Sequence, residues 1–221
     1  QFTASIWRRH LADPALWSST GHYLERGASQ RPSKVIYDRA FASIIEMKPG
    51  SFDWTEILSG ADWFHFTGMT PALSESLAAV CYVALEAAKA RQIMVSCDLN
   101  YRKNFWSKAE AGEVMSRLMP LVDVCIANEE DAADVFGISA VETDIIQGAL
   151  SKTSYAQVAQ ELTRRFDFKS VAITLRESVS ASVNHWSAML CHQRKSWFAL
   201  KYTMSSVDRV GGWDSFGAGL I

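Results

Sequence analysis

Hydrophobic and polar residues alternate in two different rhythms between residues 62 and 175 of the chain. Short apolar runs, typical of buried strands, occupy residues 62–68, 93–100, 122–128 and 170–175. Elsewhere in this region apolar residues recur every three or four positions, as on one buried helix face, at residues 74–91, 106–121, 129–136 and 153–166. This order of elements predicts an α/β fold in which a mostly parallel sheet is flanked by helices.

The segments on either side of this region have a different pattern. Residues 21–28 and 33–44 are two extended segments joined by a polar loop with Pro32, and they predict a small antiparallel β lid outside the sheet. Residues 187–202 resemble a hairpin with a basic turn at the far edge of the sheet. We therefore divide the chain into an unplaced segment (1–20), a lid (21–44) and an α/β core (45–221).

Local signals support several of these boundaries. Ser107 is the expected N-cap of the helix at 106–121. Along VIYDR, strand alternation places Tyr37 and Arg39 on one face of the lid and Asp38 on the other. A phenol beside a guanidinium suits a polyhydroxylated anion, because arginine can pair a carboxylate through two hydrogen bonds. A surface arginine beside a packed tyrosine would give the same pattern.

Composition narrows the class of protein. The chain has 221 residues, 48% of them hydrophobic and 21% charged, which is typical of a soluble globular protein. A formal net charge of −2 does not favour nucleic acid or an anionic membrane as a partner. No apolar run approaches the roughly 20 residues that span a bilayer, and the first residues lack the order of a signal peptide.

The cysteines and histidines do not form metal-ligand patterns. Four cysteines (Cys81, Cys97, Cys125 and Cys191) show no CxxC spacing, and three of them lie in apolar stretches. Reduced thiols in a cytoplasmic protein are the better interpretation, with disulfides the alternative. The five histidines are scattered, so we expect no structural zinc.

Polar or small residues end each predicted strand. They are Gly68 with Thr70, Asp98 with Asn100, Asn128, and Thr174. Arg102 lies two residues after Asn100, and Arg176 lies two residues after Thr174. Ligands of open parallel sheets bind beyond the carboxyl ends of the strands, so these residues form a candidate site. Polar loops without a function would explain any one of these positions, but their joint occurrence favours a site.

The stretch VDRVGGWDSFGAGLI ends the sequence with glycines, an aspartate and a helix start. Glycines before a helix let main-chain amides approach an anion at the positive end of the helix dipole. An aspartate in the same turn could take a proton from a neighbouring hydroxyl. The combination indicates phosphoryl transfer to an alcohol, whereas a flexible connector is the alternative for the loop alone.

This stretch resembles the C-terminal signature of the ribokinase/PfkB family of sugar kinases, Asp-x-x-Gly-Ala-Gly-Asp-x-Phe. Asp208, Gly211, Gly212, Asp214 and Phe216 occupy its defined positions. SQRPSKVIYDRA, DWFHFTGMTPAL, DLNYRKNFW, ANEEDAADVFGI and ITLRES are similar to the 2-keto-3-deoxygluconate kinase branch. The resemblance extends from about residue 21 to residue 221 and implies a ribokinase-like, Rossmann-like α/β fold.

The resemblance also implies roles for individual residues. Asp214 would be the base, and the amides of Gly212, Trp213 and Asp214 would hold the transferring phosphoryl group, with Gly211 and Gly212 serving both catalysis and ATP binding. The substrate would be held by Tyr23, Tyr37, Arg39 and Arg102. Asn128 would lie near the phosphates of Mg²⁺–ATP, through water, and Thr174 and Arg176 beside the nucleotide. The cofactors would be ATP and Mg²⁺, with no side chain as a direct metal ligand.

Three departures from the family pattern stand out. Trp213 replaces a glycine, which costs roughly 1–2 kcal/mol if the backbone there needs a positive φ, and its indole could block the phosphoryl position. Asp131 replaces a glutamate and so has a shorter reach. The family's first strand, with its Gly-Gly segment, and the helices after the glycine-rich loop have no counterpart, so we expect the chain to be truncated at both ends.

The sequence therefore predicts ATP-dependent phosphorylation of a sugar acid, 2-keto-3-deoxygluconate, to its 6-phosphate. The alternative is a catalytically silent sugar-acid-binding relative or an inactive fragment of such a kinase. Other sugars such as fructose or ribose stay open, although Arg39 and Arg102 favour an acid. An NAD-binding domain is disfavoured because no strand is followed by GxGxxG. Free edges of the lid strands also predict a homo-oligomer formed through the lid.

Overall fold

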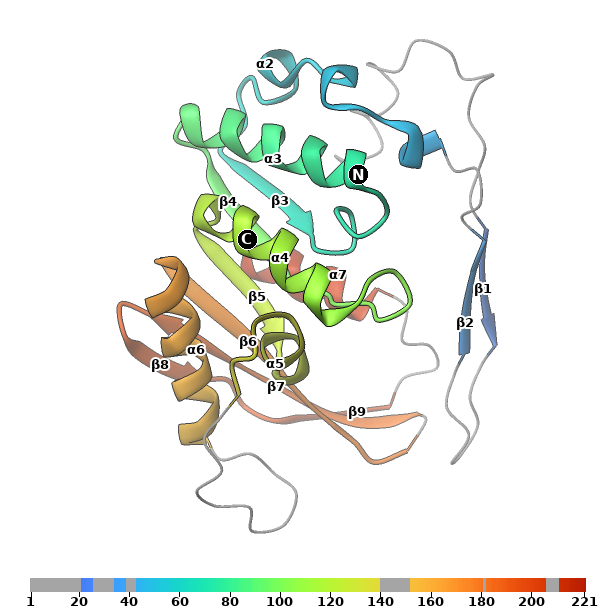
Figure 1. Cartoon of the computed structure of the whole chain (residues 1–221). Coiled ribbons are helices and arrows are strands. Elements are labelled where there is room, and N and C mark those ends of the chain that lie inside the picture. Colours follow the sequence, from blue (N-terminus) through green and yellow to red (C-terminus); the bar gives the residue numbers. More distant parts are fainter. Residues whose placement is uncertain (1–20, 26–33, 39–42, 140–151, 181, 206–210) are drawn as a thin grey trace.

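A seven-stranded sheet forms the centre of the computed structural model, which describes residues 21–25, 34–38, 43–139, 152–180, 182–205 and 211–221. Its strands are β3 (Trp63–Thr67), β4 (Met94–Asp98), β5 (Val124–Asn128), β6 (Ser170–Ser178), β7 (Val183–His192), β8 (Lys195–Phe198) and β9 (Tyr202–Ser205). Strands β3 to β6 lie in sequence order and run parallel, and β7 continues the sheet antiparallel to β6. Both β8 and β9 pair with β7 (Figure 1). The expected parallel sheet and edge hairpin are confirmed.

The helices also follow the predicted spacing. They are α3 (Glu75–Ala90), α4 (Lys108–Leu118), α5 (Glu129–Phe136), α6 (Lys152–Phe166) and α7 (Gly212–Leu220), with short α2 (Trp54–Ile57), η2 (Ser43–Glu46), η3 (Pro49–Ser51) and η4 (Met119–Leu121). Ser107 caps α4 as predicted, because its Oγ accepts the Glu110 amide and the Glu110 carboxylate accepts the Ser107 amide. Ser74 caps α3 in the same way through the Leu77 amide.

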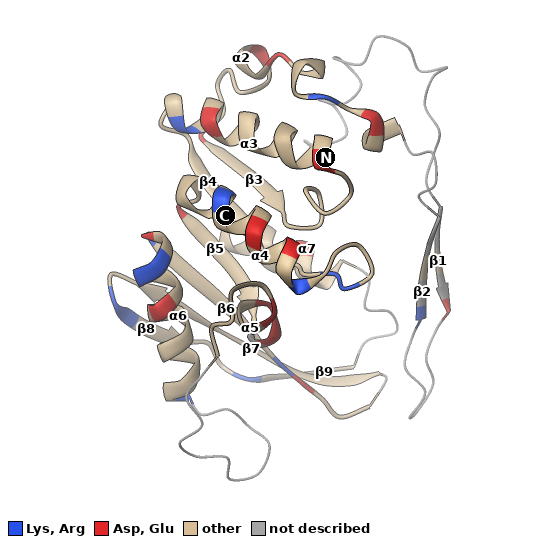
Figure 2. Cartoon of the chain, viewed as in Figure 1, with Lys and Arg blue, Asp and Glu red and all other residues tan. Residues whose placement is uncertain are grey.

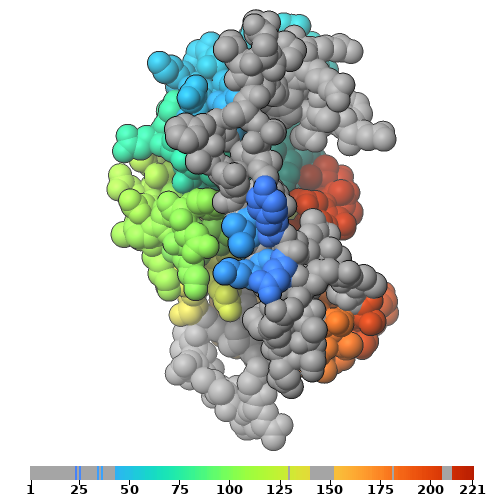
Figure 3. All heavy atoms as spheres, turned by 90° about the vertical axis from the view of Figure 1, so that its right-hand side faces the viewer, coloured from blue at the N-terminus to red at the C-terminus, as the bar shows by residue number. Residues whose placement is uncertain are grey.

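The two faces of the sheet have different compositions because side chains alternate along each strand. One face belongs to the hydrophobic core, together with α3, α4, α5 and α6; its sheet residues include Phe66, Val95, Cys97, Cys125, Ala127, Val171, Ile173 and Met189. The other face is lined by the residues between them, including His65, Thr67, Ser96, Asp98, Asn128, Thr174, Arg176 and Trp186. Figures 1 and 3 show α7 on the side of the sheet opposite α3 and α4. The polar face is thus the one that α7 covers.

A second, two-stranded sheet is formed by β1 (Gly21–Glu25) and β2 (Lys34–Asp38), which pair antiparallel as expected. Figure 3 shows it in front of the main sheet, between the green helices and red α7. In Figure 1 it stands on the side towards which the parallel strands point. The predicted extent to residue 44 is wrong, because Ser43 and Ile44 already belong to η2.

Two further details of the antiparallel part were not predicted. Strand β6 extends three residues beyond 175, because Arg176, Glu177 and Ser178 pair with β7 after the helix-covered part of the sheet ends. Strand β9 has four exposed residues and so lacks the alternation of buried and exposed positions that identifies a strand. Its backbone pairing with β7 defines it instead.

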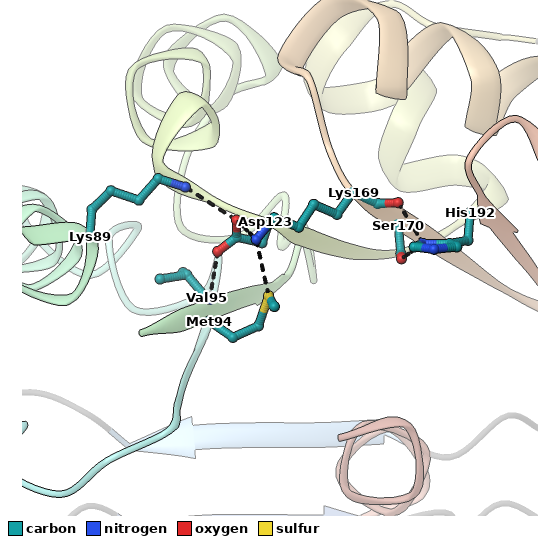
Figure 4. Close-up of polar contacts among 7 residues, drawn as sticks. All are labelled: Lys89, Met94, Val95, Asp123, Lys169, Ser170 and His192. Carbon is teal, nitrogen blue, oxygen red and sulfur yellow. Dashed lines mark hydrogen bonds and ion pairs between the residues drawn. The ribbon is translucent and has the colours of Figure 1, made fainter. Parts of the chain in front are cut away.

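A charged cluster joins the elements at the amino ends of the strands (Figure 4). The Asp123 carboxylate is buried, accepts the Val95 amide at 2.9 Å, and forms ion pairs with Lys89 at 3.2 Å and Lys169 at 3.1 Å. Burial alone would raise the pKa of Asp123, but the Val95 amide and the two lysines outweigh it and hold the pKa below its ordinary value. Asp123 thus connects α3, β4 and the start of β6 at the edge opposite the polar strand ends.

Charged groups elsewhere are mixed in sign. Figure 2 shows both acidic and basic residues on α4 and on α6, and some of them form i,i+3 or i,i+4 pairs, such as Arg164–Glu161 and Arg117–Glu113. The four cysteines are buried free thiols, and burial raises the pKa of Cys81 to about 12. No helix in the described part of the chain is both long and apolar enough to cross a bilayer.

Candidate active site

The carboxyl ends of β3 and β4 approach each other very closely. A Cβ atom on Gly68 would lie 2.2 Å from the Leu99 carbonyl oxygen, so only glycine fits at this position. The Gly68 amide donates to the Asp98 carbonyl at 2.7 Å, and the Asn100 side-chain amide donates to the Thr67 hydroxyl at 3.0 Å. Asn100 has a φ of 39°, in the left-handed region that asparagine tolerates better than most residues. These contacts define one side of the candidate site.

Asp98 ends β4 as a buried carboxyl group with a strongly perturbed pKa. Burial, and then the negative charge of Asp131, raise the pKa of Asp98 to about 7. The Asn100 amide and the Arg102 guanidinium oppose this rise in pKa, and the charge of Asp214 adds to it. The carboxyl group of Asp98 therefore changes its charge near neutral pH.

Asn128 and Asp131 form a capping box at the start of α5. The Asn128 Oδ1 atom accepts the Glu130 and Asp131 amides, both at 2.8 Å, and Asp131 Oδ2 accepts the Asn128 amide at 3.4 Å. Asp131 Oδ1 also accepts the Tyr101 amide at 3.2 Å, and burial raises the pKa of Asp131 to about 6. The short side chain of Asp131 therefore points back into its own cap and joins it to the end of β4.

Thr174 and Arg176 lie on the neighbouring strand. Thr174 pairs with Asn128 across β5 and β6 and is 2% exposed, yet its Oγ1 atom has no hydrogen-bond partner among the described residues. A buried hydroxyl without a partner is costly, which suits a site that a polar ligand completes. Two residues further on, the Arg176 guanidinium lies 5.8 Å from the centre of the Trp186 ring.

The first turn of α7 contains three amides that have no acceptor within the helix. Gly211 is its N-cap with a φ of 79°, and the first helical hydrogen bond runs from the Ser215 amide to the Gly211 carbonyl at 2.9 Å. The amides of Gly212, Trp213 and Asp214 precede this bond, so the helix itself supplies no acceptor for them. Such a turn attracts an anion through its amides and the helix dipole.

Asp214 brings a carboxylate to the same turn. Its Oδ2 atom lies 3.9 Å from where a Cβ atom on Gly211 would stand, so the side chain folds back over the start of the helix. Its negative charge raises the pKa values of Asp98 and His65. Asp98 is the last residue of β4, and His65 lies two residues before the end of β3. Asp214 therefore lies within electrostatic range of the strand ends.

A part-buried network around the buried Ser96 side chain was not predicted from the sequence. Ser96 Oγ is 2.8 Å from Trp63 Nε1 and 2.8 Å from His65 Nδ1. The indole can only donate, so the Ser96 oxygen accepts from Trp63, and the direction of its hydrogen bond with Nδ1 depends on the tautomer of His65. Burial lowers the pKa of His65, and the charge of Asp214 opposes this shift. The available signal was strand alternation, which puts His65 and Ser96 on the face of Thr67 and Asp98.

The positive φ that would strain Trp213 does not occur at this residue. Trp213 lies inside α7 and is not among the residues with positive φ in the described chain, because Gly211 supplies the left-handed conformation two residues earlier. Its indole packs edge-on against Trp186, with ring centres 6.1 Å apart and planes at 73°. The ring is thus directed at β7.

The remaining predicted site residues are placed less completely. Tyr23 lies on β1 and is 62% exposed, and Tyr37 lies on β2, where its backbone pairs with that of His22 on β1. Arg39 lies outside the described residues. Arg102 is exposed just after β4, and its charge lowers the pKa values of Asp98 and Asp131. The structure therefore brings Arg102, Asp98, Asp131 and Asp214 together, with Asn128 and Thr174 on the adjacent strand ends.

The polar groups at this edge of the sheet differ in what they can bind. The described residues contain no group of three or more histidine, cysteine or carboxylate side chains placed to hold a metal ion. The oxygens of Asn128 and Asp131 already accept main-chain amides. By contrast, the Thr174 hydroxyl, the Arg176 guanidinium and the amides of α7 are donors suited to phosphate oxygens.

The chain is similar to several known proteins. Residues 21–221 match the model of the pfkB family carbohydrate kinases. A crystal structure of 2-dehydro-3-deoxygluconokinase from Thermotoga maritima is 51% identical, with a TM-score of 0.84 over 90% of this chain and 58% of that one. A 2-dehydro-3-deoxygalactonokinase from Haloferax volcanii is 30% identical over 88% of this chain and 54% of its own length.

A third comparison concerns the fold alone. A structure from E. coli, provisionally described as ribokinase II and in complex with ATP and Mg²⁺, is 17% identical, with a TM-score of 0.64 over 91% of this chain and 56% of that one. The chain spans 54% to 58% of the lengths of the three proteins it was compared with.

Proposed function

Because the chain belongs to the pfkB family of carbohydrate kinases, we propose that it transfers the γ-phosphoryl group of ATP to a sugar acid. The proposed substrate is 2-keto-3-deoxygluconate, and the product is its 6-phosphate. One observation carries the proposal: the Asp214 carboxylate lies in the first turn of α7, beside three amides without helical acceptors and within electrostatic range of the strand ends.

In this mechanism, Asp214 accepts the proton of the sugar hydroxyl as its oxygen attacks the γ-phosphorus. The bond from phosphorus to the hydroxyl oxygen forms while the bond to the β-phosphate oxygen breaks, and ADP leaves. The amides of Gly212, Trp213 and Asp214 stabilise the negative charge on the transferring group. Both functions come from one helical turn, so their relative position is determined by the backbone.

A sugar acid is favoured over a neutral sugar by the cation near the strand ends. Arg102 is exposed where its charge acts on Asp98 and Asp131, and it would pair the substrate carboxylate. Tyr37 and Arg39 would contact the same molecule from one face of the lid, whereas Tyr23 pairs with Ile36 and so belongs to the other face. The names of the Thermotoga and Haloferax relatives both denote a 2-dehydro-3-deoxy sugar acid, which supports this substrate class.

The nucleotide would lie along the ends of β5 and β6. The Thr174 hydroxyl would form a hydrogen bond with a phosphate or ribose oxygen. Arg176 would face the phosphates, and Asn128 would contact waters around the cation. Mg²⁺ bound with ATP would neutralise charge on the phosphate oxygens. The E. coli structure with ATP and Mg²⁺ supports these two ligands for a protein of this fold.

The lid offers a surface for self-association. Tyr23 and Ile36 pair across β1 and β2 and are 62% and 50% exposed, so two large apolar side chains share one face of a two-stranded sheet. Because such a sheet is marginally stable alone, pairing with a second copy would stabilise it. Light scattering would test this proposal, with a dimer expected and a monomer contradicting it.

The substrate is tested with a panel of acceptors. Phosphoryl transfer from Mg²⁺–ATP should be measured with 2-keto-3-deoxygluconate, 2-keto-3-deoxygalactonate, fructose and ribose, alongside calorimetry for binding. We expect the two acids to bind and react in preference to the neutral sugars. Preference for a neutral sugar would contradict the assigned substrate, and sugar-acid binding without any transfer would support the silent relative instead.

A further inference from the structure

Helix α7 is weakly attached to the sheet for an element with a catalytic carboxylate. It has nine residues, of which only Gly217 is buried. Isolated helices shorter than about 12 residues are marginal in water, so packing must supply most of the stability of α7. Its N-cap Gly211 contributes no side-chain hydrogen bond either. The position of its first turn therefore depends on few contacts.

Trp213 makes an aromatic contact from that first turn to the sheet. Its ring meets Trp186 of β7 edge-on, at 6.1 Å between ring centres, a geometry that aromatic pairs favour. Trp186 pairs across the strands with Arg176, whose guanidinium lies over the same indole at 5.8 Å. The three side chains form one stack that runs from α7 through β7 to β6.

We propose that Trp213 is a positioning residue: through Trp186 it docks the first turn of α7 on the sheet and so holds Asp214 opposite the ends of β3 and β4. The value of this position for catalysis rests on the proposed kinase function, whereas the docking itself does not. The amide of Trp213 is one of the three amides proposed to bind the transferring phosphoryl group, and its indole attaches their helical turn to the sheet. The two parts of one residue therefore serve different tasks.

The consequence for Asp214 is measurable without any substrate. Asp214 raises the pKa of His65 by its charge, so the imidazole of His65 reports where the carboxylate lies. Removing that charge in Asp214→Asn should lower the pKa of His65 in an NMR titration. If Trp213 positions Asp214, Trp213→Ala should lower the pKa of His65 in the same direction while the carboxylate is still present.

The matched control is another tryptophan of the same sheet. Trp197 lies on β8, is 50% exposed and belongs to no part of the stack. Trp197→Ala should leave the pKa of His65 unchanged. Trp213→Phe should restore much of the Trp213→Ala loss because a phenyl ring can keep the edge-on contact, whereas Trp213→Leu should not. This rescue separates an aromatic contact from general apolar packing.

Two further readouts follow the stack itself. The two indoles at 73° should give an exciton couplet in circular dichroism, which Trp213→Phe and Trp186→Phe each abolish and Trp197→Phe retains. Amides of α7 should exchange roughly two- to tenfold faster in Trp213→Ala, the range expected for loss of one edge-on aromatic pair.

The proposal is overturned if Trp213→Ala leaves both the pKa of His65 and the exchange of α7 unchanged. It is also overturned if Trp197→Ala changes them equally, because the effect would then be global. None of these measurements uses ATP or a sugar acid. A kinase assay that fails would thus contradict the proposed function and leave the docking role standing, and the reverse holds as well.

Discussion

The Oδ2 atom of Asp214 lies 3.9 Å from the point where a Cβ atom on Gly211 would stand, so the carboxylate covers the start of its own helix. Gly211 has a φ of 79°, which only glycine adopts at little cost, whereas in the described part of the chain no atom lies within 4 Å of where a Cβ on Gly212 would stand. The backbone therefore requires glycine at position 211 but not at position 212.

This difference predicts opposite results for two alanine substitutions. Gly211→Ala should destabilise the first turn of α7 by roughly 1–2 kcal/mol, the cost of a left-handed L-residue. Gly212→Ala should be neutral or slightly stabilising, since alanine is the better helix former and open space receives its methyl group. Hydrogen exchange of the α7 amides would measure both. Equal effects of the two substitutions would contradict the assigned backbone geometry.

The Ser96 hydroxyl should matter for stability although it is small. Ser96→Ala leaves the Trp63 indole N–H and His65 Nδ1 without their shared partner, which should cost about 1–3 kcal/mol of unfolding free energy. Ser196→Ala is the control, because the buried Ser196 Oγ has no hydrogen-bond partner in the described chain and its loss should be neutral. Urea denaturation would compare them, and a Ser96→Ala protein as stable as the control would refute the network.

Asp98 should make the chain less stable as the pH rises. Its pKa in the folded chain, about 7, lies above its ordinary value, so folding favours the protonated form. Its contribution to stability is fully present below about pH 4 and is lost as pH rises through 7. Urea denaturation between pH 4 and 8 should show this decline, and Asp98→Asn should flatten it. An unchanged slope in Asp98→Asn would contradict the raised pKa.

Asp123 should act in the opposite sense. Its pKa lies below the ordinary value, so its contribution to stability is present above about pH 4 and is lost as pH falls through the folded pKa. Asp123→Asn should cost about 1–3 kcal/mol at neutral pH, chiefly by weakening the bonds to the Val95 amide and the lysines. Glu113→Gln, in an exposed pair on α4, should change stability by less than about 0.5 kcal/mol.

Much of the fold was predictable because its elements repeat a simple pattern. Helix α5 begins and ends at the predicted residues, 129 and 136, because Asn128 caps its start and left-handed Gly137 ends it. Strand β9 was not predictable, since its exposed residues follow no alternation and only its pairing with β7 defines it.

The candidate site likewise contains features that the sequence indicated and features that it did not. Strand ends and the glycine-rich turn indicated Asp98, Asn128, Thr174 and Asp214, because topology alone brings such positions to one edge. The contact of Trp213 with Trp186 joins residues 27 positions apart along the chain and follows no local signal. The family pattern also does not reveal which residue of the turn takes the positive φ, which is Gly211 and not Trp213.

The central claim is that Asp214 is the base of a phosphoryl transfer, and Asp214→Asn tests it most directly. The transfer rate from Mg²⁺–ATP to 2-keto-3-deoxygluconate should be measured for the parent chain and this variant, with calorimetry of the sugar acid alongside. Asp62→Asn, an exposed carboxylate just before the amino end of β3, is the control. We expect Asp214→Asn to lose about 10²–10⁴ in rate with little change in sugar-acid affinity, and Asp62→Asn to match the parent. An Asp214→Asn protein as fast as its parent would contradict the account.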